Sequence, residues 1–158
     1  MKARVYLETS VVSYLASYPS RDLIVAAHQA LTHQWWEMRR LDFDLVASVY
    51  VLDECARGDA DAARRRMEWT ATLVILPGGV QAQELADHLL QAGALPAAAH
   101  LDALHIASAA LNGVDYLLTW NCKHIANFER LPVVERVCRE SGYEPPRICT
   151  PAELMGDA

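Results

Sequence analysis

Three carboxylates and one amide of this sequence could act together on a divalent cation. Glu8 directly follows the short apolar segment "ARVYL", and Asn121 follows "VDYLLTW" in the same way. At 100° per residue, Glu54 lies at the edge of the apolar stripe of its segment, and Asp102 projects from an apolar helical face. Converging carboxylates in apolar surroundings are costly unless a cation compensates for them. The set therefore indicates a site for a divalent cation.

Each of these residues, taken alone, also has a purely structural interpretation. Glu8 could cap the helix that follows it or pair with an arginine, and Asn121 could be a turn residue after a strand. Asp102 could be a first-turn aspartate that the helix dipole stabilises. The interpretation as a metal site depends on whether the four residues converge.

The elements that must position these residues are short apolar strands alternating with helices. The pattern predicts strands over 3–7, 43–48, 73–77 and 114–120, helices over 10–16, 19–40, 49–56, 59–73, 80–93, 97–113 and 131–143, and a last strand with a final helix within 147–154. This alternation is typical of an α/β fold with a mostly parallel central sheet of four to five short strands and helices on both faces. Ligands bind beyond the carboxyl ends of such strands, where Glu8 and Asn121 stand.

Two helix starts carry capping residues. Ser20 is the expected N-cap of the long helix within 19–40, with Asp22 in its first turn. Thr150 and Glu153 form the expected capping box of the final helix, and Pro151 occupies its first position.

The bulk properties indicate one domain over residues 1–158, without repeats or linkers. No apolar stretch approaches the roughly 20 residues that span a bilayer, and the N-terminus lacks the pattern of a signal peptide. We therefore expect no membrane association and a cytoplasmic protein, in which the four separated cysteines are free thiols. The net charge of −6 opposes non-specific affinity for nucleic acid and counts against a simple nucleic-acid-binding module.

The order of three segments, "YLETSVVSYL", "VYVLDECARGD" and "LDALHIASAALNGVDYLLTWNCKHIAN", resembles the PIN domain, in particular the VapC-type ribonuclease toxins. The resemblance covers nearly the whole chain. It implies an endoribonuclease that depends on Mg²⁺ or Mn²⁺, with a catalytic and metal-binding site formed by Glu8, Glu54, Asp102 and Asn121. It also implies an RNA substrate, a small antitoxin protein as partner of the toxin, and a homodimer.

Two positions depart from the family pattern. Glu8 stands where the family usually has an aspartate, and Asn121 stands where an aspartate is common, so we expect weaker metal binding than at a four-acid site. Glu8 and Asp102 would hold the metal, and Glu54 would orient a metal-bound water or complete the ligand shell. Three hydroxyl side chains would support them: Thr9, Ser10 and Thr119. The alternative is a non-catalytic PIN-like binding or assembly module with a degenerate metal site.

The loop "WNCKHIAN" brings further polar residues to the expected site. Lys123 could meet a phosphate, and His124 could act as an acid, a metal ligand or a hydrogen-bond anchor. A loop held in place by its own side chains is an equally valid interpretation. On the helix before it, His105 could pair with Asp102 at i,i+3, or simply be packed in the core.

Overall fold

The sheet is parallel throughout and follows the strand order β3-β2-β1-β4-β5. The computed structural model describes residues 1–157. In this part of the chain the strands are β1 Ala3–Leu7, β2 Phe43–Ser48, β3 Val74–Leu76, β4 Tyr116–Leu118 and β5 Arg147–Cys149. The predicted α/β class with a parallel sheet is confirmed, and the strand count reaches the upper expected value.

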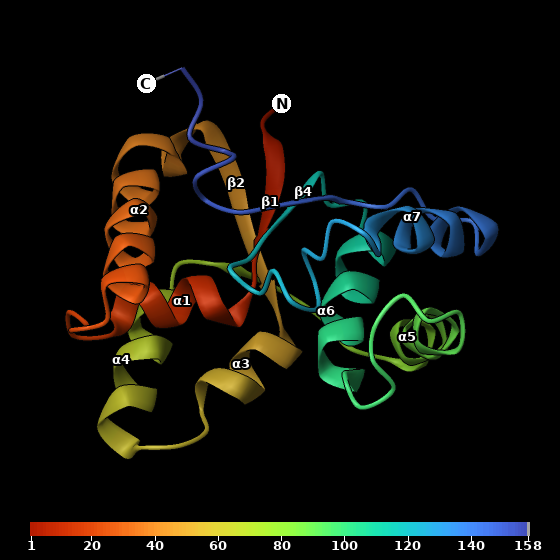
Figure 1. Cartoon of the computed structure of the whole chain (residues 1–158), viewed down its shortest axis with the longest axis horizontal. Coiled ribbons are helices and arrows are strands. Elements are labelled where there is room, and N and C mark those ends of the chain that lie inside the picture. Colours follow the sequence, from red (N-terminus) through yellow and green to blue (C-terminus); the bar gives the residue numbers. More distant parts are fainter. Residues whose placement is uncertain (158) are drawn as a thin grey trace.

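The helices form two groups, one on each side of the sheet (Figure 1). Their bounds are α1 Thr9–Ala16, α2 Leu23–Arg39, α3 Val49–Cys55, α4 Ala60–Thr70, α5 Val80–Gln91, α6 His100–Leu111 and α7 Leu131–Glu140, with a 3₁₀ turn at Arg40–Asp42. Helices α1, α2 and α4 pack together on one side, and α5, α6 and α7 on the other. None of the helices within residues 1–157 is both long and apolar enough to cross a membrane.

The central strands are apolar because helices cover both of their faces. Val5, Tyr6 and Leu7 of β1 are buried without alternation, as are Leu117 and Leu118 of β4. The edge strand β3 is different, since its first residue, Val74, is 63% exposed. This distribution explains why the sequence shows continuous apolar runs at the centre of the sheet.

Two predicted helix starts need correction. The N-cap of α2 is Asp22, whose carboxylate accepts a hydrogen bond from Val25 N at 2.9 Å. Ser20 instead accepts from Asp22 N at 3.1 Å, so it shapes the turn before the helix. Helix α6 begins at His100, because the residues before it form a turn closed by a hydrogen bond from Ala99 N to Pro96 O.

The predicted final helix does not form. Its capping box is present, since Thr150 N donates to Glu153 Oε1 at 2.9 Å and Glu153 N donates to Thr150 Oγ1 at 3.3 Å. The chain then makes only a turn over residues 151–154. The carbonyl of Leu154 accepts hydrogen bonds from the side chains of Trp35 and Arg39, which tie this segment to α2. A single turn held by tertiary contacts does not propagate into a helix.

The strand order reverses direction at the centre of the sheet. From β1 the chain first builds outward through β2 and β3, and later returns to place β4 and β5 on the other side. Strands β1 and β4 are therefore the switch point at which parallel sheets usually bind ligands. Their carboxyl ends meet directly, because Glu8 N donates to Leu118 O at 3.1 Å.

Candidate metal centre

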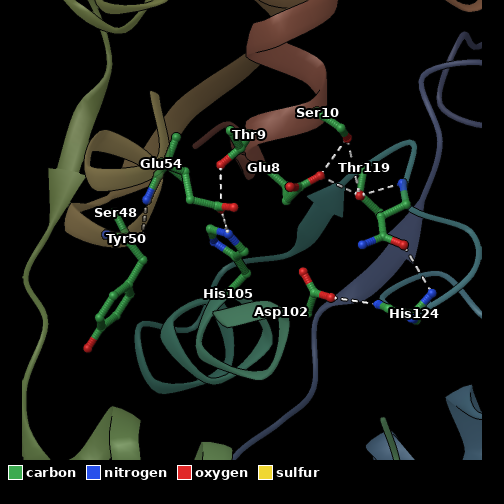
Figure 2. Close-up of polar contacts among 12 residues, drawn as sticks. Glu8, Thr9, Ser10, Ser48, Tyr50, Glu54, Asp102, His105, Thr119 and His124 are labelled. Carbon is green, nitrogen blue, oxygen red and sulfur yellow. Dashed lines mark hydrogen bonds and ion pairs between the residues drawn. The ribbon is translucent and has the colours of Figure 1, made fainter. Parts of the chain in front are cut away.

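Glu8 projects from the end of β1 into the switch point (Figure 2). Its side chain is buried, with only 5% exposed, and its Oε1 accepts hydrogen bonds from Ser10 Oγ at 2.5 Å and Thr119 Oγ1 at 2.6 Å. Glu8 occupies the N-cap position of α1, but its carboxylate makes no capping hydrogen bond. No arginine or lysine of the described chain lies within ion-pair distance of it. The carboxylate of Glu8 therefore neither caps α1 nor pairs with an arginine, although its backbone stands at the N-cap position.

Glu54 reaches the same space from the last turn of α3. Its Oε1 accepts a hydrogen bond from Thr9 Oγ1 at 2.7 Å and another from the His105 imidazole. Burial is the largest influence and raises the pKa of this carboxyl, but the hydrogen bond and charge of His105, the hydrogen bond from Thr9 and the charge of Arg57 together lower it by more. The pKa of Glu54 consequently lies below its ordinary value, and the side chain is an ionised carboxylate at neutral pH.

His105 contacts the candidate site, although the sequence did not assign it there. It is fully buried on α6, with Nδ1 2.7 Å from the Tyr6 hydroxyl and Nε2 bonded to Glu54. The possible pairing with Asp102 is not formed, because the imidazole points toward β1 and α3. A histidine among apolar helical residues resembles a core residue in the sequence, and its partners lie far away along the chain.

Asp102 lies in the first turn of α6, and its Oδ2 accepts a hydrogen bond from His124 Nδ1 at 2.9 Å. Asn121 holds His124 in place, since its Oδ1 accepts from His124 N at 3.0 Å. Asn121 N in turn donates to Thr119 Oγ1 at 2.9 Å. The amide oxygen of Asn121 thus stabilises the loop, which is the turn role that the sequence also allowed.

Each of the three acids keeps one oxygen without a hydrogen-bond partner within residues 1–157. These atoms are Glu8 Oε2, Glu54 Oε2 and Asp102 Oδ1. Figure 2 shows the free oxygens of Glu54 and Asp102 directed toward Glu8. One ligand atom from each of Glu8, Glu54 and His105 falls within a group whose members lie no more than 4.8 Å apart. That group does not include Asp102, so the structure brings Glu8 and Glu54 together, with the free oxygen of Asp102 directed toward Glu8 from α6.

This donor set fits a hard divalent cation. Mg²⁺ and Mn²⁺ prefer carboxylate oxygens, and Mg²⁺ usually needs only one or two protein carboxylates because it keeps several waters. Glu8 has hydroxyl donors but no cationic partner, and the partners of Glu54 and Asp102 are histidines. A cation would relieve the mutual repulsion of three clustered carboxylates.

The supporting residues occupy the positions that the sequence suggested. Thr9 contacts Glu54, while Ser10 and Thr119 contact Glu8. Lys123 is exposed on the following loop, and its carbonyl oxygen accepts a hydrogen bond from Asn127 Nδ2 at 2.9 Å. The loop is therefore held by its own side chains, Asn121 and Asn127.

Comparison with known proteins supports the fold assignment. No family model matches the chain, and no curated protein is similar to it in sequence. Among solved structures, the crystal structure of VapBC2 from Rickettsia felis, bound to a DNA fragment from its promoter, contains a similar chain. The TM-score is 0.61 at 15% sequence identity, over 93% of this chain and 98% of that chain. The similarity and the parallel five-stranded sheet together show that this chain has a PIN-like fold.

Proposed function

We propose that this protein is a Mg²⁺- or Mn²⁺-dependent endoribonuclease that hydrolyses RNA phosphodiester bonds and acts as the toxin of a type II toxin–antitoxin pair. One observation carries the proposal: three carboxylates from separate segments present free oxygens to one another at the switch point of a PIN-like sheet. A structural role alone does not require three such groups in one place.

Each residue of the site would have a separate role in the proposed reaction. A bound divalent cation lowers the pKa of its water and offsets negative charge on the phosphate. Glu8 and Asp102 would offer oxygens to the cation, and Glu54 would either complete this ligand shell or accept a hydrogen bond from the attacking water and so orient it. Ser10 and Thr119 fix the direction of Glu8 by occupying its other oxygen. Lys123, on the adjoining loop, would contact an RNA phosphate.

The partners follow from the same proposal. The similar chain belongs to VapBC2, which supports a small antitoxin protein as the partner of this chain. We further propose that the chain forms a homodimer in the cytoplasm, as the family resemblance implies. Co-purification of the tagged chain with the product of an adjacent small gene tests the antitoxin, and light scattering tests the dimer.

The central test compares RNA cleavage by the wild-type protein and an Asp102→Asn variant, in Mg²⁺ and in Mn²⁺. We expect the variant to lose about 100-fold or more in rate, the scale at which removal of one electrostatic group usually acts. Asp53→Asn is the matched control, because Asp53 is an exposed neighbour of Glu54 on the same helix. Equal cleavage by wild type and Asp102→Asn would indicate a contaminating nuclease and reject the proposal.

The hydrogen bonding of Asn121 favours a second candidate function. Its amide oxygen accepts a backbone hydrogen bond from His124, so the fourth position of the site serves the loop. A non-catalytic PIN-like module would show the same feature. Calorimetric titration with Mn²⁺ separates the two functions: the nuclease requires saturable binding that Asp102→Asn weakens, whereas the module predicts no saturable binding.

A further inference from the structure

A chain of buried polar side chains lies behind Glu54. Ser48 Oγ is 2.6 Å from the Tyr6 hydroxyl, which is 2.7 Å from His105 Nδ1, and His105 Nε2 contacts Glu54 Oε1. Ser48, Tyr6 and His105 are all fully buried. The chain joins the ends of β1 and β2 to α6 and α3, so it connects the centre of the sheet to the site.

The direction of each hydrogen bond can be assigned by counting donors and acceptors. Ser48 caps α3, and its Oγ accepts from Tyr50 N at 3.2 Å and Val51 N at 3.4 Å. Its own hydroxyl proton is then available only to the Tyr6 oxygen. Tyr6 in turn donates its proton to His105 Nδ1. In the opposite direction Ser48 would accept three hydrogen bonds, and its own proton would have no acceptor.

This assignment decides the role of His105. When Nδ1 accepts a hydrogen bond, a neutral imidazole carries its proton on Nε2, and Nε2 donates to the Glu54 carboxylate. A protonated Nε2 has no lone pair for a metal ion. Although His105 lies close enough to Glu8 and Glu54 to join a metal site, its geometry is that of a hydrogen-bond donor to a ligand.

We infer that His105 and Tyr6 are positioning residues: they fix Glu54 Oε1 through this chain, so that Oε2 faces the free oxygens of Glu8 and Asp102. The role that this inference gives to Glu54 rests on the proposed function. The assigned tautomer of His105 does not, because it follows from the hydrogen bonds alone. Burial raises the pKa of Tyr6 well above its ordinary value, and the nearby charges of Glu8 and Glu54 add to this. Tyr6 therefore keeps its proton and can donate it at neutral pH.

Nitrogen NMR of the imidazole tests the tautomer directly. In metal-free protein at neutral pH we expect the proton of His105 on Nε2 and an unprotonated, hydrogen-bonded Nδ1. The same pattern should persist in saturating Mg²⁺. A proton on Nδ1, in either condition, would overturn the inference. Pulsed electron resonance of bound Mn²⁺ gives a second measurement: nitrogen coupling that disappears in His105→Gln would make His105 a ligand.

Three variants test the positioning role through Mn²⁺ affinity, measured by calorimetry. Tyr6→Phe removes only the hydroxyl and should weaken binding by about 10-fold, the lower end for loss of an outer-shell partner. His105→Leu should weaken it more, and His105→Gln, which keeps a donor toward Glu54, should recover part of the loss. His100→Gln is the control, since His100 is an exposed residue on the same helix.

The outcomes separate this inference from the proposed function. Wild-type affinity in Tyr6→Phe, or equal affinity in His105→Gln and His105→Leu, would reject the positioning role while leaving the nuclease intact. Because His105 is fully buried, circular dichroism of each variant checks that the fold is retained, and Tyr6→Phe remains informative if His105→Leu unfolds. Absence of Mn²⁺ binding to the wild type would reject the proposed function, and the NMR result would still assign the tautomer.

Discussion

At the scale of single residues, the protein uses one oxygen of each acid to fix the direction of the other. Glu8 is oriented by two hydroxyls, Glu54 by a hydroxyl and an imidazole, and Asp102 by His124. The longer side chain of Glu8 has more rotamers than an aspartate, and the contacts of Ser10 and Thr119 with one oxygen compensate for that freedom.

The lowered pKa of Glu54 predicts an acid-dependent contribution to stability. Its folded pKa lies below the value of an unperturbed glutamate, roughly 4.3. The stabilising contribution is therefore fully present above that value and disappears as pH falls through the folded pKa. In metal-free buffer, Glu54→Gln should lower the free energy of unfolding at pH 6, and its difference from the wild type should shrink toward pH 3.

Urea denaturation at a series of pH values measures this difference. Asp53→Asn is again the control, because it removes a neighbouring but exposed carboxylate. A Glu54→Gln difference that stays constant from pH 6 to pH 3 would show that the carboxylate charge plays no part in stability.

At the scale of elements, the ends of helices depend on which side chain reaches the free backbone N–H groups. Asp22→Ala should lower the free energy of unfolding by about 1 kcal/mol, because it removes the hydrogen bond to Val25 N. Thermal or urea denaturation measures the loss. Arg21→Ala, an exposed change one residue earlier, should be near neutral; an equal loss in both variants would assign the effect to the loop instead of the cap.

The sequence predicted the elements better than their ends. The bounds of β1 and β2 agree with the predicted ranges, because continuous apolar runs bounded by polar residues define buried strands. Ser20 and Asp22 are both good capping residues, so only the three-dimensional path of the chain decides between them. The final helix failed for a similar reason, since the carbonyl of Leu154 is bound by α2.

The site was predictable to the extent that its residues interrupt apolar patterns. Glu8, Glu54 and Asp102 do so, which is why the sequence named them as candidates. Tyr6 and His105 sit within apolar runs and resemble core residues until their partners are known. Those partners come from the pairing of β1 with β2 and the packing of α6 against α3, neither of which a local pattern encodes.

At the scale of the whole molecule, stability depends on the centre of the sheet more than on its edges. Leu117 is fully buried in β4, between β1 and β5, whereas Val74 is largely exposed on the edge strand β3. Leu117→Ala should lower the free energy of unfolding by about 3 kcal/mol, and Val74→Ala by about 0.5 kcal/mol or less. Urea denaturation checks both values; similar losses would contradict this arrangement of the core.

The strand order also determines at which stage of synthesis the site can form. Glu8 and Glu54 leave the ribosome early, whereas Asp102 and His105 of α6, and the Thr119 that follows β4, are made only after residue 100. A nascent polypeptide that ends before β4 lacks a strand that pairs with β1, and it lacks Thr119 and His124, which contact Glu8 and Asp102. Most of the chain must therefore be synthesised before the three carboxylates and all of their polar partners can assemble.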